Sequence, residues 1–253
     1  MRLGLGLAIN QIWGGGLWNP AQIDTAAWFD ASDLSTITES GGSVSQWDDK
    51  SGANHFVQAI GANQPITDTR TLNGLNAIDF NGTGAFMEHG TNLSFPDGLS
   101  IAVAFDQDST ATSKRIVGVY NAVSKASFVL DSDNYLRYDG AASAGSVSAT
   151  IGAHIRVASK SANALVQTGF VDGSSNVSDT AALVDSASVK LNVGTPVVAL
   201  NQFFNGIIGE IVLLDYEATT DNRQNLEGYL AWKWGMVPNL PVDHPYKTSP
   251  PMS

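Results

Sequence analysis

The chain has 253 residues, of which 43% are hydrophobic and only 15% are charged, so it is long and apolar enough for one large β domain with a real core or for two small ones. Its formal net charge is −11 and its basic residues form no cluster, which argues against a nucleic-acid partner, because phosphate backbones are bound by basic surfaces. No run approaches the roughly 18 apolar residues of a membrane span, and without cysteine there is neither a disulfide nor a thiolate metal site.

The first 20 residues differ in pattern from the rest of the chain. Leucines alternate with glycines from Leu3 to Leu7, which gives an extended segment one apolar and one bare face. We therefore predict that residues 1–20 form an N-terminal arm that docks on another protein. No removable signal is expected, because no small-x-small cleavage site follows the apolar run. The predicted anchoring side chains are Leu3, Leu5, Leu7, Ile9 and Trp13.

From residue 21 onward, short apolar or alternating runs are separated by turn signals. Asn-Gly and Asp-Gly pairs tolerate positive φ angles and fit tight hairpins. They stand at residues 73–74, 81–82, 97–98, 139–140, 172–173 and 205–206. The runs with strand character lie at residues 99–105, 116–120, 127–130, 135–138, 155–158, 165–171 and 207–214. Many short strands with regular turns predict an all-β antiparallel sandwich.

One helix is predicted at Thr219–Trp234, near the end of the chain. Thr219 or Thr220 can cap its start, and Gly235 suits a left-handed C-cap. The proline-rich tail that follows should be extended and lie along a surface. The predicted organisation is thus an arm at 1–20, a sandwich domain at 21–238 and a tail at 239–253.

Several sequence segments resemble a known family. They are WFDASD at 28–33, VSQWDDKSG at 44–52, AIDFNG at 77–82, FNGIIGEI at 204–211, LEGYLAWKWG at 226–235 and LPVDHPY at 240–246. Together they resemble the concanavalin-A-like, laminin-G-type jelly-roll domains of bacteriophage virion proteins and bacterial surface proteins, over residues 21–247. The resemblance implies two antiparallel sheets stacked face to face, with a concave side that often binds sugars.

Nothing in the sequence predicts an enzyme. Glycoside hydrolases need two carboxyl groups about 5–10 Å apart, and jelly-roll glucanases of similar fold carry Glu-x-Asp-x-x-Glu on one strand. The five glutamates here do not form that pattern, and Glu210 is alone on its predicted strand. No Gly-x-Ser-x-Gly elbow is present, and the histidines lack zinc-binding spacing. His244 is expected to tie down the C-terminal tail.

Calcium is the one cofactor that the sequence leaves open. Carboxylates are the hard oxygen ligands that Ca²⁺ prefers, and the resembled family sometimes holds Ca²⁺ with loop aspartates. The favoured interpretation is nevertheless turn capping, in which aspartate accepts hydrogen bonds from backbone N–H groups. The candidate ligands are Asp30, Asp33, Asp48, Asp49 and Asp79.

Aromatic rings are candidates for stacking on the apolar faces of sugars. Each candidate could equally belong to the core, because aromatic side chains alternate into sandwich interiors. The candidate glycan contacts are Trp47, Tyr120, Tyr135 and Tyr138.

The leading hypothesis is a non-catalytic structural protein of a phage virion: a tail fibre, a tail-tip protein or a capsid-surface decoration. It would bind other virion proteins through its arm, form a homo-oligomer and display a lectin-like jelly roll to host-surface glycans. The alternative is a secreted, extracellular bacterial carbohydrate-binding module or glucanase relative. A third interpretation, a cell-surface adhesion module, is weaker because no anchor sequence is visible.

Overall fold

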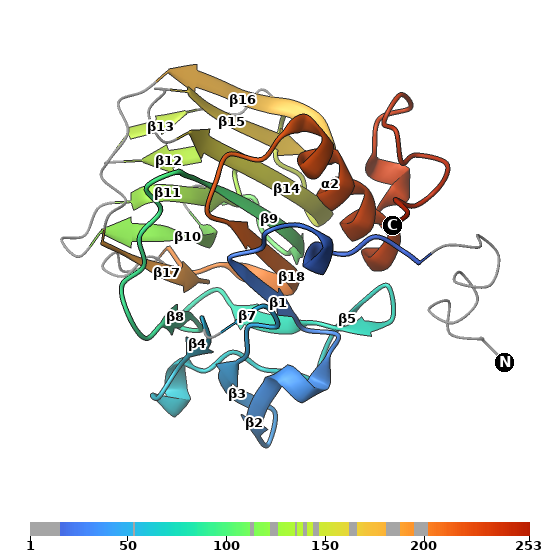
Figure 1. Ribbon diagram of the computed structural model, residues 1–253. Coiled ribbons are helices and arrows are strands. Elements are labelled where there is room, and N and C mark those ends of the chain that lie inside the picture. The colour runs from blue at the N-terminus through green and yellow to red at the C-terminus, as the bar shows by residue number, and fades with distance from the viewer. Residues whose placement is uncertain are drawn as a thin grey trace, which may run out of the picture.

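The protein is a sandwich of two antiparallel β sheets (Figure 1). The computed structural model describes residues 16–52, 54–111, 114–121, 126–134, 136–138, 141–143, 147–161, 166–180, 188–194 and 202–253. Within these residues, one α-helix follows the last strand, so the predicted all-β sandwich with a C-terminal helix is confirmed. Most of the predicted N-terminal arm lies outside the described residues.

The first sheet has seven strands among the described residues, in the spatial order β1, β18, β9, β14, β15, β16, with β7 beside β18. The second has nine, in the order β13, β12, β11, β10, β17, β8, β4, β3, β2, and β5 pairs separately with β6. The strands are β1 (Ala27–Asp30), β2 (Ile37–Ser40), β3 (Ser43–Trp47), β4 (Phe56–Val57), β5 (Thr71–Leu72), β6 (Leu75–Asn76), β7 (Ile78–Asn81), β8 (Met87–His89), β9 (Gly98–Gln107), β10 (Arg115–Asn121), β11 (Ala126–Asp131), β12 (Leu136–Tyr138), β13 (Ala141–Ser143), β14 (Gly152–Ser161), β15 (Val166–Val171), β16 (Ser174–Thr180), β17 (Val189–Val193) and β18 (Asn205–Leu214). The short 3-10 helices are η1 (Pro20–Gln22), η2 (Leu34–Thr36), η3 (Gly61–Asn63) and η4 (Val237–Asn239).

The central strands of the seven-stranded sheet are buried on both faces. On β9, Leu99, Ile101 and Val103 belong to the core between the two sheets, while Ala102 and Ala104 belong to a second cluster under the helix. Successive side chains of a strand point to opposite faces, so one strand serves both cores. Its small outward residues leave room for a helix.

The helix α2 (Thr220–Trp234) lies over the outer face of this sheet, as Figure 1 shows. The side chain of Thr219 accepts a hydrogen bond from the backbone N–H of Asn222, and Gly235 closes the helix with a φ of 77°. The predicted helix and both of its caps are therefore confirmed. Gly209 of β18 lets the helix approach, since a Cβ there would stand 2.8 Å from the Trp234 ring.

Of the six predicted tight turns, two are confirmed, three are wrong and Asp139-Gly140 lies outside the described residues. Asn81-Gly82 ends β7 and Asp97-Gly98 begins β9, and neither pair joins two paired strands. Asn73-Gly74 joins β5 to β6, and Asp172-Gly173 joins β15 to β16, each with positive φ at both residues, as a type I′ turn requires. Asn205-Gly206 instead begins β18 and pairs with β7 and β9. A Cβ at Gly206 would lie 2.2 Å from the carbonyl oxygen of Asp106, so this glycine serves close strand packing and not a turn.

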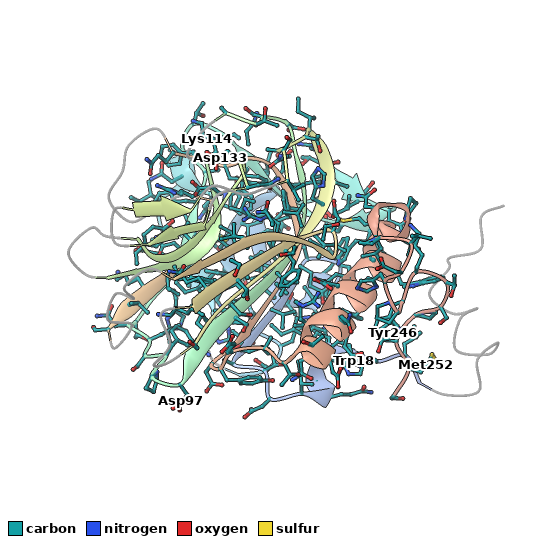
Figure 2. The ribbon with its side chains drawn as sticks, turned by 90° about the horizontal axis from the view of Figure 1, so that it is seen from above. Trp18, Asp97, Lys114, Asp133, Tyr246 and Met252 are labelled. Carbon is teal, nitrogen blue, oxygen red and sulfur yellow. The ribbon has the colours of Figure 1, made fainter. Side chains whose placement is uncertain are left out.

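The C-terminal tail follows the surface of α2, but it is folded by turns and is not simply extended. The backbone N–H of His244 donates to the Pro241 carbonyl, and the Tyr246 ring fills the space above Gly228 of the helix. Figure 2 shows Tyr246, Trp18 and Met252 close to α2.

The first and last described residues run side by side. Leu17 forms an antiparallel bridge with Met252. The Trp18 N–H donates to the Pro251 carbonyl at 3.1 Å, and the Ser253 N–H donates to the Gly16 carbonyl at 3.0 Å. The chain therefore enters and leaves the fold on the side of α2.

Candidate functional site

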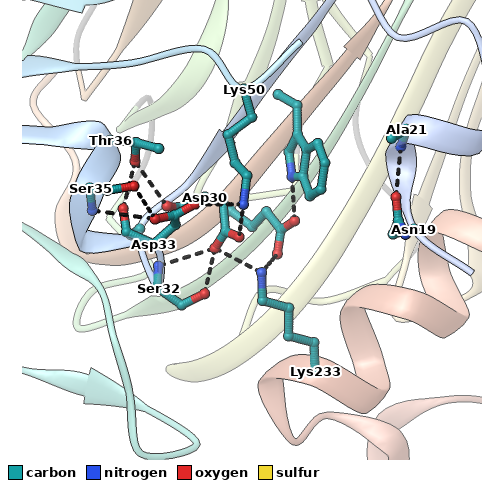
Figure 3. Close-up of polar contacts among 12 residues, drawn as sticks. Asn19, Ala21, Asp30, Ser32, Asp33, Ser35, Thr36, Lys50 and Lys233 are labelled. Carbon is teal, nitrogen blue, oxygen red and sulfur yellow. Dashed lines mark hydrogen bonds and ion pairs between the residues drawn. The ribbon is translucent and has the colours of Figure 1, made fainter. Parts of the chain in front are cut away.

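A cluster of charged side chains lies where β1, β18 and α2 meet, with Asp30 and Glu210 buried at its centre, and Figure 3 shows part of it. We call Asp30, Asp33, Glu210, Lys50 and Lys233 the carboxylate cluster. Asp30 and Glu210 stand opposite each other in the pairing of β1 with β18. The Nζ of Lys233 lies 2.7 Å from Asp30 Oδ1 and 2.7 Å from Glu210 Oε2, so one lysine bridges both carboxylates.

The carboxylate of Glu210 is fully buried and accepts four hydrogen bonds. Besides Lys233, the donors are Trp28 Nε1 at 2.6 Å, Tyr229 OH at 2.8 Å and Trp234 Nε1 at 2.7 Å. These four donors fill the lone pairs of the carboxylate. No oxygen of Glu210 is left to meet a ligand.

The two carboxyl groups have opposite pKa shifts. Burial raises the pKa of Glu210 above its ordinary value, against the attraction of Lys233. Burial also opposes ionisation of Asp30, but the charge and hydrogen bond of Lys233, with Ser32 and Lys50, outweigh it and lower the pKa of Asp30. A pair of acids with divergent pKa values is a common mark of catalysis. Here both groups are instead engaged in holding β1, β18 and α2 together.

The second lysine of the cluster fixes the chain that follows β1. Lys50 Nζ lies 2.9 Å from Asp33 Oδ2 and 3.1 Å from Asp30 Oδ2, and 4.6 Å from the centre of the Trp28 ring. The same aspartates cap turns, because Asp30 accepts from Ser32 and Asp33 accepts from Ser35.

The five aspartates considered as calcium ligands do not converge on one site, since the carboxylates of Asp30 and Asp33 meet only through Lys50. Asp49 accepts hydrogen bonds from three backbone N–H groups, those of Trp28, Ser51 and Asn54. Asp48 accepts from the Gln46 amide, and Asp79 lies 3.6 Å from Arg70. Within the described part of the chain, no three acidic, histidine or cysteine side chains form a group that could hold a metal ion. Turn capping and ion pairing account for the contacts of these residues.

The Thr150 hydroxyl, the His154 imidazole and the Asp172 carboxylate form a hydrogen-bonded series at the start of β14. His154 Nε2 lies 2.9 Å from Thr150 Oγ1, and His154 Nδ1 lies 2.7 Å from Asp172 Oδ2. This is the order of groups in a hydrolase triad. The same Nε2 also lies 3.1 Å from the Thr150 carbonyl, and Asp172 accepts the Ile155 N–H. These hydrogen bonds therefore tie the segment before β14 to the Asp172-Gly173 turn.

The pKa of His154 is shifted by its surroundings in this hydrogen-bonded series. Burial disfavours the charged imidazole, but the hydrogen bond and charge of Asp172 outweigh it, so the pKa of His154 is raised above its ordinary value. No sequence spacing indicated this arrangement, because His154 and Asp172 meet only through the pairing of β14 with β15.

Two of the predicted glycan contacts are wrong. Trp47 is fully buried and packs against the Phe29 and Phe56 rings at centroid distances of 5.6 and 6.2 Å. Tyr120 is only 2% exposed. A sugar cannot stack on rings that no solvent reaches, so both belong to the packed interior.

The remaining predicted residues, apart from His244, have no described side chain. Tyr135 lies outside the described residues, and Tyr138 contributes only its backbone, in β12. The anchoring residues outside the described residues are Leu3, Leu5, Leu7, Ile9 and Trp13. The exception is His244, whose Nε2 lies 3.1 Å from the buried Glu227 Oε2 of α2. The prediction that it ties down the tail is confirmed.

No known family model and no curated protein sequence matches the chain. Solved structures do match its fold. Domain 4 of AbnA, an extracellular GH43 arabinanase from Geobacillus stearothermophilus solved with arabinotriose, superposes with a TM-score of 0.61 at 12% identity, over 81% of this chain and 98% of that domain. Trypanosoma rangeli sialidase in complex with sialic acid gives a TM-score of 0.61 at 14% identity, over 89% of this chain and 38% of the enzyme. At such low identity these matches establish the β-sandwich fold. No described helix is long and apolar enough to cross a membrane.

Proposed function

We propose that this protein is a non-catalytic β-sandwich domain that binds glycans and is carried by a phage particle. One observation carries the glycan-binding part. The sandwich corresponds to almost the whole of an arabinanase domain that was solved with arabinotriose, at 98% coverage of that domain. The match with the sialidase covers only 38% of that enzyme, so its catalysis is not transferred.

The carboxylate cluster supports the absence of catalysis. A glycoside hydrolase needs one carboxyl group that gives a proton to the leaving oxygen and a second that attacks or activates water. Glu210 is 0% exposed and saturated by four donors, and Asp30 is 4% exposed and paired with two lysines. Neither group is placed to meet a sugar.

The phage assignment rests on the resemblance of the sequence and on the position of the chain ends. Residues 16–18 enter the fold beside residues 251–253, against α2. If the arm predicted at residues 1–20 docks on virion proteins, the α2 side of the domain would face the particle. We include a homo-oligomer in the proposal, which sedimentation velocity of the full chain would test.

The test is a glycan array probed with the full-length protein, followed by calorimetry and product analysis with each glycan that binds. We expect saturable binding without cleavage. Absence of binding to every glycan would overturn the glycan-binding role, and release of new reducing ends would overturn the non-catalytic role. Immunogold labelling of purified particles tests the virion assignment separately.

A secreted carbohydrate-binding module is the second candidate. It is favoured by the match to a domain of an enzyme described as extracellular. The two candidates differ in location: label on tails or capsids supports the virion protein, and unlabelled particles with free protein in the culture fluid support the secreted module.

A further inference from the structure

One amine and two carboxyl groups of the carboxylate cluster meet at a single point. Lys233 Nζ, from the last turn of α2, lies 2.7 Å from Asp30 Oδ1 and 2.7 Å from Glu210 Oε2. Because Oδ1 is bonded to Cγ, the nitrogen is at most one C–O bond farther from the Asp30 carbon. Figure 3 shows the Lys233 side chain directed at Asp30. The amine and the carboxyl carbon are therefore held within reach of each other, which favours a reaction between them.

Little water reaches these three groups. Asp30 and Glu210 are buried, and the Lys233 side chain is only 18% exposed. The ring centres of Tyr229 and Trp234 lie 5.6 and 5.1 Å from Lys233 Nζ. Condensation of an amine with a carboxyl group releases water, so a site that excludes water favours the amide over the separate groups.

Glu210 is suited to carry a proton between the two reacting groups. The carboxylate cluster holds three carboxyl groups and two lysines, so its charges balance when one carboxyl group holds a proton. Burial raises the pKa of Glu210, and Glu210 therefore takes up a proton more readily than an exposed carboxylate does. Its contact with Lys233 Nζ puts it where a proton carrier must stand.

We propose that Lys233 and Asp30 form an amide cross-link within the chain, with Glu210 as the proton carrier. The reaction needs no other reactant and occurs once in each molecule. The cross-link joins β1 to α2, the first strand to the helix that follows the last one. It is independent of what the domain binds, and it makes covalent a contact that the ion pairs already hold.

The reaction starts from the ion pair. Glu210 takes one proton from the Lys233 ammonium, and the neutral amine attacks Asp30 Cγ to form the C–N bond. Lys50 Nζ, 3.1 Å from Asp30 Oδ2, stabilises the negative charge that develops there. Oδ1, to which Ser32 Oγ donates at 2.6 Å, receives the proton from Glu210 and a second proton from the nitrogen, and then leaves as water. One ammonium and one carboxylate thus become one amide and one water molecule, and Glu210 returns to its initial state.

The experiment is intact-mass spectrometry of the denatured full-length protein, followed by peptide mapping. The wild type should weigh less than its sequence requires by one water molecule, and proteolysis should yield a branched peptide that joins the segments around Asp30 and Lys233. Lys233→Arg keeps the positive charge but lacks the amine, and Glu210→Gln cannot carry the proton, so both should have the full mass. Lys190→Arg, which changes a lysine in a surface ion pair with Glu88, should retain the loss of water.

Each other outcome contradicts the proposal in a distinct way. A folded wild type of full mass would show that Lys233 and Asp30 form an ion pair only. A branched peptide through Lys50 would overturn the choice of Lys233, and a loss of water without any branched peptide would place the change elsewhere in the chain. Thermal melting establishes that each variant is folded. The peptide map of the wild type decides the question even if a variant does not fold.

Discussion

The two sheets of the sandwich share one core but differ on their outer faces. In the seven-stranded sheet the outward side chains beneath α2 include Ala102, Ala104 and Val157, and the helix and tail cover them. In the nine-stranded sheet the outward side chains include Phe86 and Glu88, and no α-helix of the described chain covers them. The sheet under the helix therefore presents small apolar residues on its outer face, and the other sheet presents partly exposed aromatic and charged residues near β8.

The largest effect is expected from replacing Glu210, which joins the seven-stranded sheet to α2. Glu210→Leu removes the acceptor of two indole N–H groups and of the Tyr229 hydroxyl, and it leaves Lys233 with Asp30 alone. We expect a loss of about 3–5 kcal/mol in the free energy of unfolding, measured by urea denaturation. Glu217→Leu, at an exposed position, should change stability by less than about 0.5 kcal/mol. A similar loss in both variants would contradict a special role for Glu210.

A smaller effect is expected from crowding the contact between sheet and helix. In Gly209→Ala the new Cβ would meet the Trp234 ring at 2.8 Å, so the helix must shift, at a cost of about 1–3 kcal/mol. Gly61→Ala is the matched control, because no neighbouring atom lies within 4 Å of the place that its new methyl group would take. Denaturation midpoints of the two variants measure the difference, and equal midpoints would show that α2 is not closely packed there.

The stability of α2, and so its packing on the seven-stranded sheet, can also be reduced at the first turn of the helix. Thr219→Ala removes the hydroxyl that accepts from the Asn222 N–H at 3.1 Å, and should cost about 1 kcal/mol. Thr220→Ala removes the neighbouring hydroxyl and leaves the cap intact. If both variants melt at the same temperature, the Thr219 cap contributes nothing.

The smallest effect is a pH dependence from His154. The pKa of His154 is raised in the folded state, so its pairing with Asp172 stabilises the fold fully below pH 6.5, the ordinary value. This contribution is lost as the pH rises through the raised folded pKa. The wild type should lose less than about 1 kcal/mol relative to His154→Gln across that window, measured by urea denaturation at several pH values. A constant difference between the two proteins would refute the coupling.

Local patterns predicted the parts of this molecule that local chemistry determines. The capped helix, the Asn73-Gly74 hairpin and the strand runs depend on neighbouring residues, and each is found. Asn205-Gly206 failed because the same dipeptide also serves close strand contact.

The candidate sites depended on contacts between distant residues, and the sequence did not reveal them. Trp28 and Glu210 are 182 positions apart in the chain, and Asp30 meets Lys233 only after α2 docks. Alternation along a strand predicts two faces but not which face is covered. It therefore could not show that Trp47 is in the core or that Phe86 faces outward.

The pairing of residues 16–18 with 251–253 has a mechanical consequence. The two segments are antiparallel, and Gly16 and Ser253 stand together at their outer end. A force that pulls these two residues apart would load the hydrogen bonds one after another, starting with the Ser253 N–H to Gly16 carbonyl bond. The bonds between residues 16–18 and 251–253 would break in turn before the long strands of the sandwich separate. If the domain is tethered through both ends, the tail on α2 would detach first under load, while both sheets of the sandwich stay intact.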